Sequence, residues 1–226
     1  FANSSECMKI VRLLATKGIG FTRKEIAEKT KVPYGGGLSA SLDALEASQM
    51  VVRYQPFKQS SRQLRYRLSD LFCMFFIHFM EKGNITDENY WSNNQLRPQN
   101  NAWSGFAFER VCYVHTSQIK SALGISGVLT EISPWISKRQ KGGVQIDMLI
   151  NRADNVLNVC EMKFSNKEFV ITASYEGELR NKFDILEAEE SPSQSMHPVI
   201  ITTYGLKQNE YSGIIQNVIT MDDLFR

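Results

Sequence analysis

The stretch "GGVQIDMLINRADNVLNVCEMKF", residues 142–164, predicts two short apolar strands joined by the polar turn "NRADN". Each strand carries one acid, Asp147 in the first and Glu161 in the second, and Lys163 follows the second acid by two residues. A short turn between two such strands is typical of an antiparallel hairpin. Because side chains alternate along a strand, Gln145 and Asp147 share one face of the first strand, and Glu161 and Lys163 share one face of the second.

This pattern has a chemical interpretation and a structural one. Carboxylates held close together repel one another unless a divalent cation lies between them, and oxygen ligands suit Mg²⁺ or Mn²⁺. Such a metal activates a bound water and stabilises the charge of a phosphate, while a nearby lysine positions the nucleophile. The alternative is that Asp147 and Glu161 lie on the polar face of a half-exposed hairpin, and spacing alone favours this alternative.

The elements around the hairpin predict an α/β domain over residues 102–226, because helices alternate with the strands of a mixed sheet. The expected elements are a helix over residues 103–124 that brings Glu109 near the acids, a strand near 128–135, a basic turn at 137–143, a helix over 172–190, a buried strand at 197–205, and a last strand with a terminal turn after residue 212.

The helix predicted over residues 172–190 holds several polar side chains, namely Tyr175, Glu176, Glu178 and Lys182. These side chains could approach the acids, but we expect them to form a solvated helix face. Gln145 is a candidate contact to the substrate or to the side chains that hold the metal. The three histidines, His78, His115 and His197, are scattered along the chain and are expected to be structural.

Residues 1–82 predict a winged helix-turn-helix domain. A first helix repeats Met8, Val11 and Leu14 along one face. Thr22 and Glu25 have the spacing of a capping box that begins a second helix, and a third helix over residues 38–45 repeats three leucines. The segments "MVVRY" and "QLRYRL" then predict a hairpin, and three helices followed by a hairpin are the winged variant of this motif.

The predicted hairpin of this first domain is basic. Between residues 51 and 67 it holds five basic side chains and no acid, namely Arg53, Lys58, Arg62, Arg65 and Arg67. Such a patch suits contact with DNA phosphates. The third helix offers Ser39, Ser41, Asp43 and Glu46 but no Arg or Lys, which argues against sequence-specific readout. A scaffold module with a solvated basic hairpin is an equally open interpretation.

Composition and charge set the organisation of the chain. At 226 residues, with 42% hydrophobic and 11% aromatic residues, the chain predicts two packed domains. Residues 1–90 hold 13 Lys and Arg against 9 Asp and Glu, whereas residues 91–226 hold 13 against 15. The Asn-rich segment at residues 83–101 lies at this change of charge, so we expect it to be the linker.

The remaining sequence features concern the cellular compartment. The apolar run at residues 71–80 is too short to cross a bilayer and predicts a buried helix, so no membrane partner is expected. The four cysteines lack CxxC spacing, which favours a reduced, cytoplasmic protein without a disulfide scaffold or structural zinc. There is no signal-peptide pattern and no initial Met, so we expect a fragment of a longer protein.

The order of the acids resembles a known superfamily. Glu109 in a helix, Asp147 in a strand and Glu161-Met162-Lys163 in the next strand resemble the PD-(D/E)xK nucleases, although Ile146 stands where the name has Pro. The resemblance implies that Asp147 and Glu161 bind Mg²⁺ or Mn²⁺, that Glu109 is an accessory acid, and that Lys163 lies next to the attacking water.

A narrower resemblance covers nearly the whole chain. The segments "GGVQID", "LNVCEMKFS" and "TMDDLF" are similar to the C-terminal nuclease-like domain of a group of prokaryotic AAA+ ATPases, and residues 1–20 resemble the winged-helix junction of those proteins. The resemblance implies a magnesium-dependent DNA endonuclease; the alternative is a non-catalytic regulatory or protein-interaction module of the ATPase. The chain has no GxxxxGK[ST] pattern, so ATP is expected only in an N-terminal ATPase domain outside it.

Overall fold

The computed structural model describes residues 4–81, 83, 88–94, 97–138 and 143–226. The chain divides into two compact units, unit 1 (Phe1–Ala107) and unit 2 (Phe108–Arg226). The class is α/β, because helices accompany one three-stranded and one five-stranded sheet. None of the described helices combines the length and the apolar character that crossing a bilayer requires.

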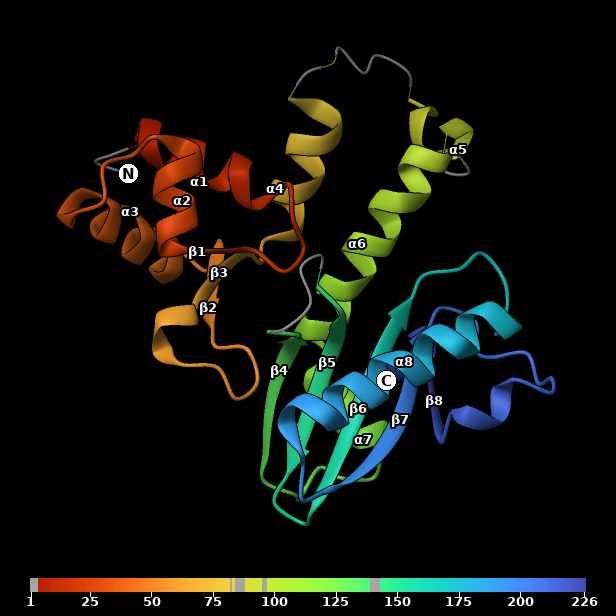
Figure 1. Ribbon diagram of the computed structural model, residues 1–226. Helices are drawn as coiled ribbons and strands as arrows, with labels where there is room; N and C mark the ends of the chain where they lie inside the picture. The colour runs from red at the N-terminus through yellow and green to blue at the C-terminus, as the bar shows by residue number, and fades with distance from the viewer. Residues whose placement is uncertain (1–3, 82, 84–87, 95–96, 139–142) are drawn as a thin grey trace. The chain divides into compact units, whose positions relative to one another are not determined.

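Unit 1 holds three helices, a small sheet and further helical segments (Figure 1). In chain order its elements are α1 (Ser4–Leu14), β1 (Phe21–Thr22), α2 (Arg23–Thr30), α3 (Gly36–Ala47), β2 (Val51–Tyr54), the 3₁₀ turn η1 (Ser61–Gln63), β3 (Arg65–Leu68), α4 (Leu71–Phe75), the π-helical segment η2 (Phe76–Met80), α5 (Tyr90–Asn94) and the first part of α6 (Pro98–Val114).

The local signals of unit 1 act as the sequence predicts. Thr22 Oγ1 accepts from the Glu25 amide at 3.2 Å and the Glu25 carboxylate accepts from the Thr22 amide at 2.7 Å, so the capping box that begins α2 is confirmed. The leucines of α3 are buried in the core of the unit. Strands β2 and β3 form the predicted antiparallel hairpin, and β1 adds to it in the order β1-β3-β2.

The predicted burial of two segments of unit 1 is wrong. The apolar run at residues 71–80 is helical but only half-buried: Phe72 is 67% exposed, whereas Met74 and Phe79 are buried. A run that is apolar all round indicates no particular face, so packing alone selects the residues that enter the core. Similarly, α1 buries Cys7, Ile10, Val11 and Leu14 and leaves Met8 exposed.

Unit 2 continues α6 and builds the larger sheet. Its further elements are α7 (Thr116–Ala122), β4 (Thr130–Ile136), β5 (Gln145–Arg152), β6 (Val156–Lys163), α8 (Ala173–Glu190), β7 (Ser195–Thr202), the 3₁₀ turn η3 (Ser212–Ile214), β8 (Asn217–Thr220) and α9 (Met221–Leu224).

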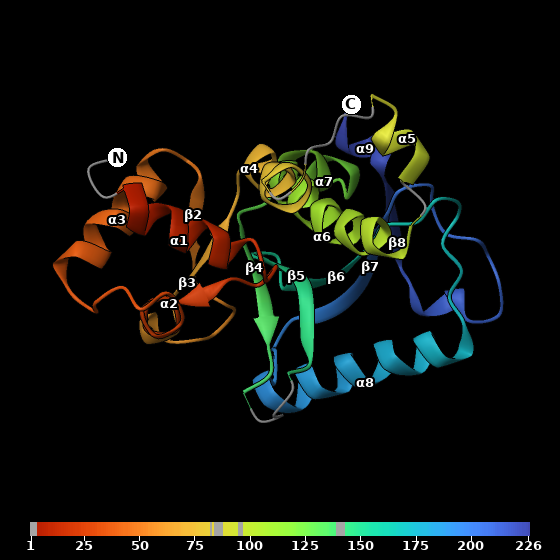
Figure 2. The same cartoon turned by 90° about the horizontal axis from the view of Figure 1, so that it is seen from above.

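The sheet of unit 2 lies between helices on its two faces (Figure 2). Its order is β4-β5-β6-β7-β8; β4, β5 and β6 are antiparallel, and β6, β7 and β8 are parallel. On one face, Met148, Cys160 and Ile201 pack with residues of α6, α7 and α9. On the other face, Ile200 packs with Leu179 of α8, which connects β6 to β7. Strand alternation therefore directs Glu161 toward the face that α8 covers.

The elements predicted for unit 2 are largely confirmed, and the hairpin at residues 142–164 is formed by β5 and β6. The single helix expected over residues 103–124 is wrong: α6 ends at Val114 and α7 begins at Thr116. His115 lies between them, and its amide donates to both Val111 and Cys112 carbonyls. This break carries no Gly or Pro signal.

Two predicted segments, the basic turn at residues 137–143 and the linker at residues 83–101, are described only in part. Most of the basic turn at residues 137–143 lies outside the described residues, since 139–142 are not described. The segment 83–101, predicted as a linker, contains α5 and the first turn of α6. Helix α6 begins in unit 1 and ends in unit 2.

Candidate functional site

The two acids of the hairpin, Asp147 and Glu161, lie just beyond the last backbone pair of β5 and β6. Paired residues run from Asn151↔Leu157 to Met148↔Cys160, and extending this register by one position sets Asp147 opposite Glu161. There the Asp147 carboxylate replaces a backbone acceptor, because its Oδ2 accepts from the Met162 amide at 2.9 Å. The hairpin predicted from the sequence therefore brings its two acids together.

Glu161 is a buried carboxylate with cationic partners. Its side chain is 1% exposed, and both its oxygens accept from Lys182 Nζ of α8 at 2.7 Å. Lys163 Nζ lies 3.6 Å from Glu161 Oε2. Tyr175 Oη, also from α8, donates to Glu161 Oε2 at 3.5 Å, and Lys163 Nζ lies 5.3 Å from the centre of the Tyr175 ring. We call Glu109, Asp147, Glu161, Lys163, Tyr175 and Lys182 the carboxylate site.

Helix α6 supplies the third acid. Glu109 is largely buried, and its pKa is raised to about 7, first by burial and next by the negative charge of Asp147. Arg110 and Lys163 oppose this rise, whereas Glu161 adds to it. One turn further along α6, Tyr113 Oη donates to the Asp147 carbonyl at 2.6 Å and fixes the helix against β5. Glu109 is therefore electrostatically linked to both acids of the hairpin.

The charges inside the site act on one another. Burial and the charge of Asp147 raise the pKa of Glu161, and Lys182 and Lys163 oppose the rise. Burial and the charge of Glu161 also raise the pKa of Tyr175, so its phenol stays protonated and can donate. Acids with raised pKa values, gathered around a specific charge partner, are a recognised mark of functional sites.

The expectation of a solvated face on α8 is wrong for Lys182 and Tyr175. Tyr175, Leu179, Lys182 and Leu186 follow one another at helical spacing, and both leucines are fully buried. The face that holds them is therefore the inner face of the helix. This leucine spacing is the signal that would have placed Lys182 and Tyr175 on the inner face.

The other polar side chains near the site stay at the surface. Glu176 accepts from Arg180 on the outside of α8, and Glu178 is exposed. Gln145 is exposed at the start of β5, two residues from Asp147, where it pairs with Ile136 of β4. These three remain outside the hydrogen bonds and ion pairs that join the carboxylate site.

The carboxylate site offers oxygen donors that could hold a divalent cation. Asp147, Glu161 and Glu109 offer carboxylate oxygens, which fit Mg²⁺ or Mn²⁺ in kind. Within the described part of the chain, however, no three His, Cys, Asp or Glu side chains meet as a group ready to hold a metal. Both Glu161 oxygens contact Lys182, and one Asp147 oxygen contacts an amide. The donors fit a cation, whereas their present partners compete with it.

The five basic residues of the hairpin in unit 1 divide into two kinds. Lys58 and Arg62, between the strands, and Arg53 on β2 are exposed, and Arg53 pairs with Glu46 at 3.3 Å. Arg65 donates to the Gly20 carbonyl at 2.9 Å and lies 3.5 Å from Glu25. Arg67 is 8% exposed and lies over the Tyr54 ring. Arg65 and Arg67 therefore pack inward and do not form a phosphate-binding surface.

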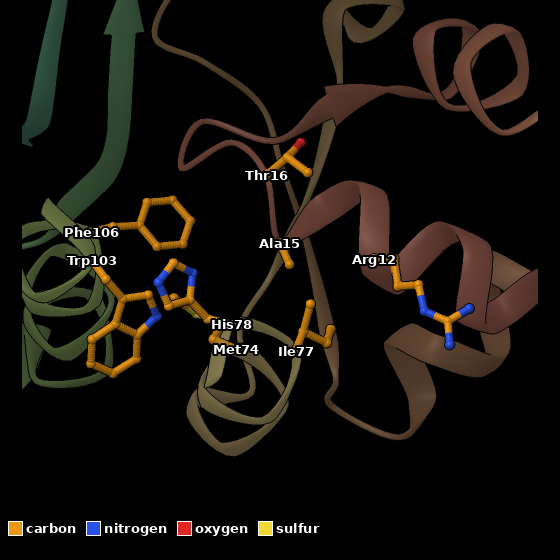
Figure 3. A pocket seen from close by; sticks show the side chains of 8 residues that line it. All are labelled: Arg12, Ala15, Thr16, Met74, Ile77, His78, Trp103 and Phe106. Atoms are coloured by element: carbon orange, nitrogen blue, oxygen red, sulfur yellow. The ribbon is translucent and has the colours of Figure 1, made fainter. Parts of the chain in front are cut away.

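Unit 1 also contains a cavity of about 550 Å³. The rings of His78, Trp103 and Phe106 gather on one side of it, and Arg12 lies on the other (Figure 3). His78 stacks on Trp103, and burial lowers the pKa of its imidazole. Arg12 donates to Glu81 at 2.7 Å. His78 thus has a packing role, as the sequence predicts.

Comparisons with known proteins identify no family for this chain. No protein-family model and no curated protein matches the chain. A solved structure described as "Crystal Structure of Protein of Unknown Function AF1548" is similar at 17% identity and a TM-score of 0.36; the match spans 50% of this chain and 64% of that one. At this TM-score, the likeness supports no conclusion about fold or function.

Proposed function

We propose that unit 2 hydrolyses phosphodiester bonds in DNA at the carboxylate site, with Mg²⁺ or Mn²⁺ as cofactor. The observation that carries the proposal is the electrostatic contact between Asp147 and Glu161 just beyond the last pair of the β5–β6 ladder, with Lys163 3.6 Å from Glu161. The order of these residues is the one that resembles the PD-(D/E)xK nucleases, and the mixed sheet with helices on both faces is compatible with such a domain.

In this proposal each side chain has a separate task. Asp147 and Glu161 would hold the cation through their oxygens, and Glu109 would complete the acidic group. When bound, the cation supplies an activated water and neutralises charge on the phosphate. Lys163 would lie next to the water and orient it. Glu109, with a pKa of about 7, exchanges a proton near neutral pH and is the accessory acid.

We further propose that unit 1 is a winged helix that contacts DNA. Three helices followed by the β2–β3 hairpin support this, and the contact would come from the exposed Lys58 and Arg62. Helix α3 presents no Arg or Lys, so we expect binding to phosphates without base readout.

The competing candidate is a non-catalytic module that docks onto the AAA+ ATPase domain implied by the sequence resemblance. One observation favours it: Glu161 already has a cation, Lys182, on both oxygens, so its charge is neutralised without a metal. A buried ion pair of this kind is compatible with a purely structural role.

The experiment that separates these candidates measures DNA cleavage and ion binding together. Supercoiled DNA is incubated with the full chain and Mn²⁺ or Mg²⁺, and thermal melts are recorded with and without the ion. We expect ion-dependent nicking and a higher melting temperature, since an ion that binds only the folded state stabilises it. Glu161→Gln should abolish both effects, and Glu178→Gln, an exposed acid on α8, should keep both. Intact DNA together with an unchanged melting temperature would favour the docking module.

A further inference from the structure

Among the described side chains of the carboxylate site, Lys182 makes the closest contact with another of its side chains. Its Nζ lies 2.7 Å from both Oε1 and Oε2 of Glu161, so a single ammonium spans the whole carboxylate. The Glu161 side chain is 1% exposed and that of Lys182 is 21% exposed. Ion pairs inside a protein are screened less by water and salt than surface pairs. The pair is thus built into the interior of unit 2.

Helix α8 presents this ammonium from a fixed position. The helix begins at Ala173 and is capped by Thr172, whose Oγ1 accepts from the Tyr175 amide at 3.2 Å, and it is anchored by the buried Leu179 and Leu186. Lys182 lies between these two leucines on the inner face. Lys163, in contrast, reaches Glu161 along its own strand at 3.6 Å. The two lysines therefore contact Glu161 in different ways, and the spanning contact belongs to the lysine from the helix.

A divalent cation bound by Glu161 needs the same oxygens that Lys182 holds. An ammonium and a divalent cation on one carboxylate repel each other, and in a buried site this repulsion is strong. The two cations therefore exclude one another on Glu161. We propose that Lys182 is a positioning residue that holds Glu161 in the metal-free protein, and that a divalent cation displaces its ammonium when it binds. This inference rests on the metal site of the proposed function.

The contact between Lys182 and Glu161 matters most in the metal-free protein, where the carboxylates of the site repel one another. Without a cation, Glu161 would be a buried charge beside Asp147 and Glu109, which repel it. Lys182 opposes this repulsion and keeps Glu161 oriented between β6 and α8. If the ion pair is only structural, the metal does not take the Glu161 oxygens that Lys182 holds, and removing the ammonium does not tighten metal binding. Metal affinity, rather than activity, is the quantity that distinguishes the two roles.

The test is a titration of the full chain with Mn²⁺, in which binding is measured by calorimetry or by the spectroscopic signal of the bound ion. Wild type is compared with Lys182→Met, which keeps the length of the side chain and removes its charge. We expect Lys182→Met to bind Mn²⁺ at least tenfold more tightly. Lys182→Arg keeps the charge and should bind as weakly as wild type. Lys207→Met, which removes the charge of an exposed lysine, is the matched control and should leave the affinity unchanged.

The titration is performed at pH 8, because the pKa of Glu161 is raised by burial and by Asp147. At lower pH a proton on Glu161 would replace the lysine as the competitor of the metal in Lys182→Met. Binding that is unchanged or weaker in Lys182→Met, while wild type binds, would overturn the inference and leave the metal site in place. An absence of binding in every variant would overturn the metal site, and with it both the inference and the proposed function.

A second measurement uses wild type alone and does not depend on the folding of a variant. Amine-reactive labelling with mass spectrometry reports how fast each lysine is modified. We expect Lys182 to be labelled slowly without metal and several-fold faster at saturating Mn²⁺, while Lys207 is labelled at one constant rate. If Mn²⁺ binds and the labelling of Lys182 does not increase, the ammonium has not been displaced and the inference is wrong.

Discussion

At the scale of single residues, Asp147 performs two tasks that different substitutions separate. Its carboxylate accepts from the Met162 amide, and its charge raises the pKa of Glu109. Asp147→Asn keeps an acceptor and removes the charge, whereas Asp147→Ala removes both. We expect Asp147→Asn to leave the free energy of unfolding nearly unchanged without metal, and Asp147→Ala to lower it by about 1 to 3 kcal/mol, because the buried amide loses its partner.

Denaturant unfolding of the two variants in EDTA checks this prediction. Equal losses in both would mean that the charge of Asp147, and not its hydrogen bond, stabilises the metal-free fold. The same samples with Mn²⁺ give the control, since neither variant should be stabilised by the ion.

Glu109 predicts a dependence of stability on pH. Its folded pKa of about 7 lies above the ordinary glutamate pKa of 4.5, so between these pH values the folded state holds more protons than the unfolded state. The contribution of Glu109 to stability is therefore fully present below pH 4.5 and is lost as the pH rises to 7. Relative to Glu109→Gln, wild type should lose on the order of 3 kcal/mol between pH 4.5 and 8, given about 1.4 kcal/mol for each pH unit.

Unfolding free energies of wild type and Glu109→Gln at several pH values provide the measurement. Their difference cancels the titration of groups that the substitution leaves alone. A difference that does not change with pH would show that Glu109 has an ordinary pKa and lies apart from the other acids.

At the scale of elements, the β2–β3 hairpin separates exposed from inward-packed basic side chains. If the hairpin contacts DNA, the double substitution Lys58→Ala and Arg62→Ala should weaken binding to any duplex and reduce the slope of log affinity against log salt by up to about 2, since each lost phosphate contact removes about 0.9. Arg67→Ala should instead lower thermal stability, because Arg67 lies buried over Tyr54.

Duplex binding at several salt concentrations measures this slope. The matched control removes two exposed lysines of unit 2, Lys167 and Lys207, and changes the net charge equally. An equal change of slope in the control and in the hairpin variant would indicate a general effect of charge and leave unit 1 as a scaffold.

At the scale of the whole molecule, α6 determines which fragment containing unit 2 can fold by itself. The helix starts at Pro98, and its later residues supply Glu109 and the buried Phe108 and Cys112. We expect a fragment of residues 98–226 to fold and to bind Mn²⁺ as the full chain does, and one of residues 108–226, which lacks the first turns of α6, to be less stable. Circular dichroism melts compare the two fragments.

Limited proteolysis of the full chain gives an independent check. We expect the first cleavage at residues 83–97, in the polar segment before α6. A first cleavage elsewhere, with the fragment of residues 98–226 unfolded, would show that the boundary of the second domain is misplaced.

The sequence by itself determined the features that depend on near neighbours. The capping box of Thr22 and Glu25, the leucines of α3 and the hairpin of β5 and β6 follow from spacing within a few residues. The same alternation placed Asp147 with Gln145 on one face of β5 and Glu161 with Lys163 on one face of β6, because strand geometry has a period of two residues.

Only the tertiary structure decided which faces meet. Lys182 reaches Glu161 across 21 positions of sequence, Arg67 turns inward onto Tyr54, and Phe72 stays exposed in an apolar run. Local periodicity describes the faces of an element but holds no information on the element that will cover each face. The burial of Lys182 depends on α8 crossing the sheet above Glu161, and this crossing is fixed by the packing of many residues at once.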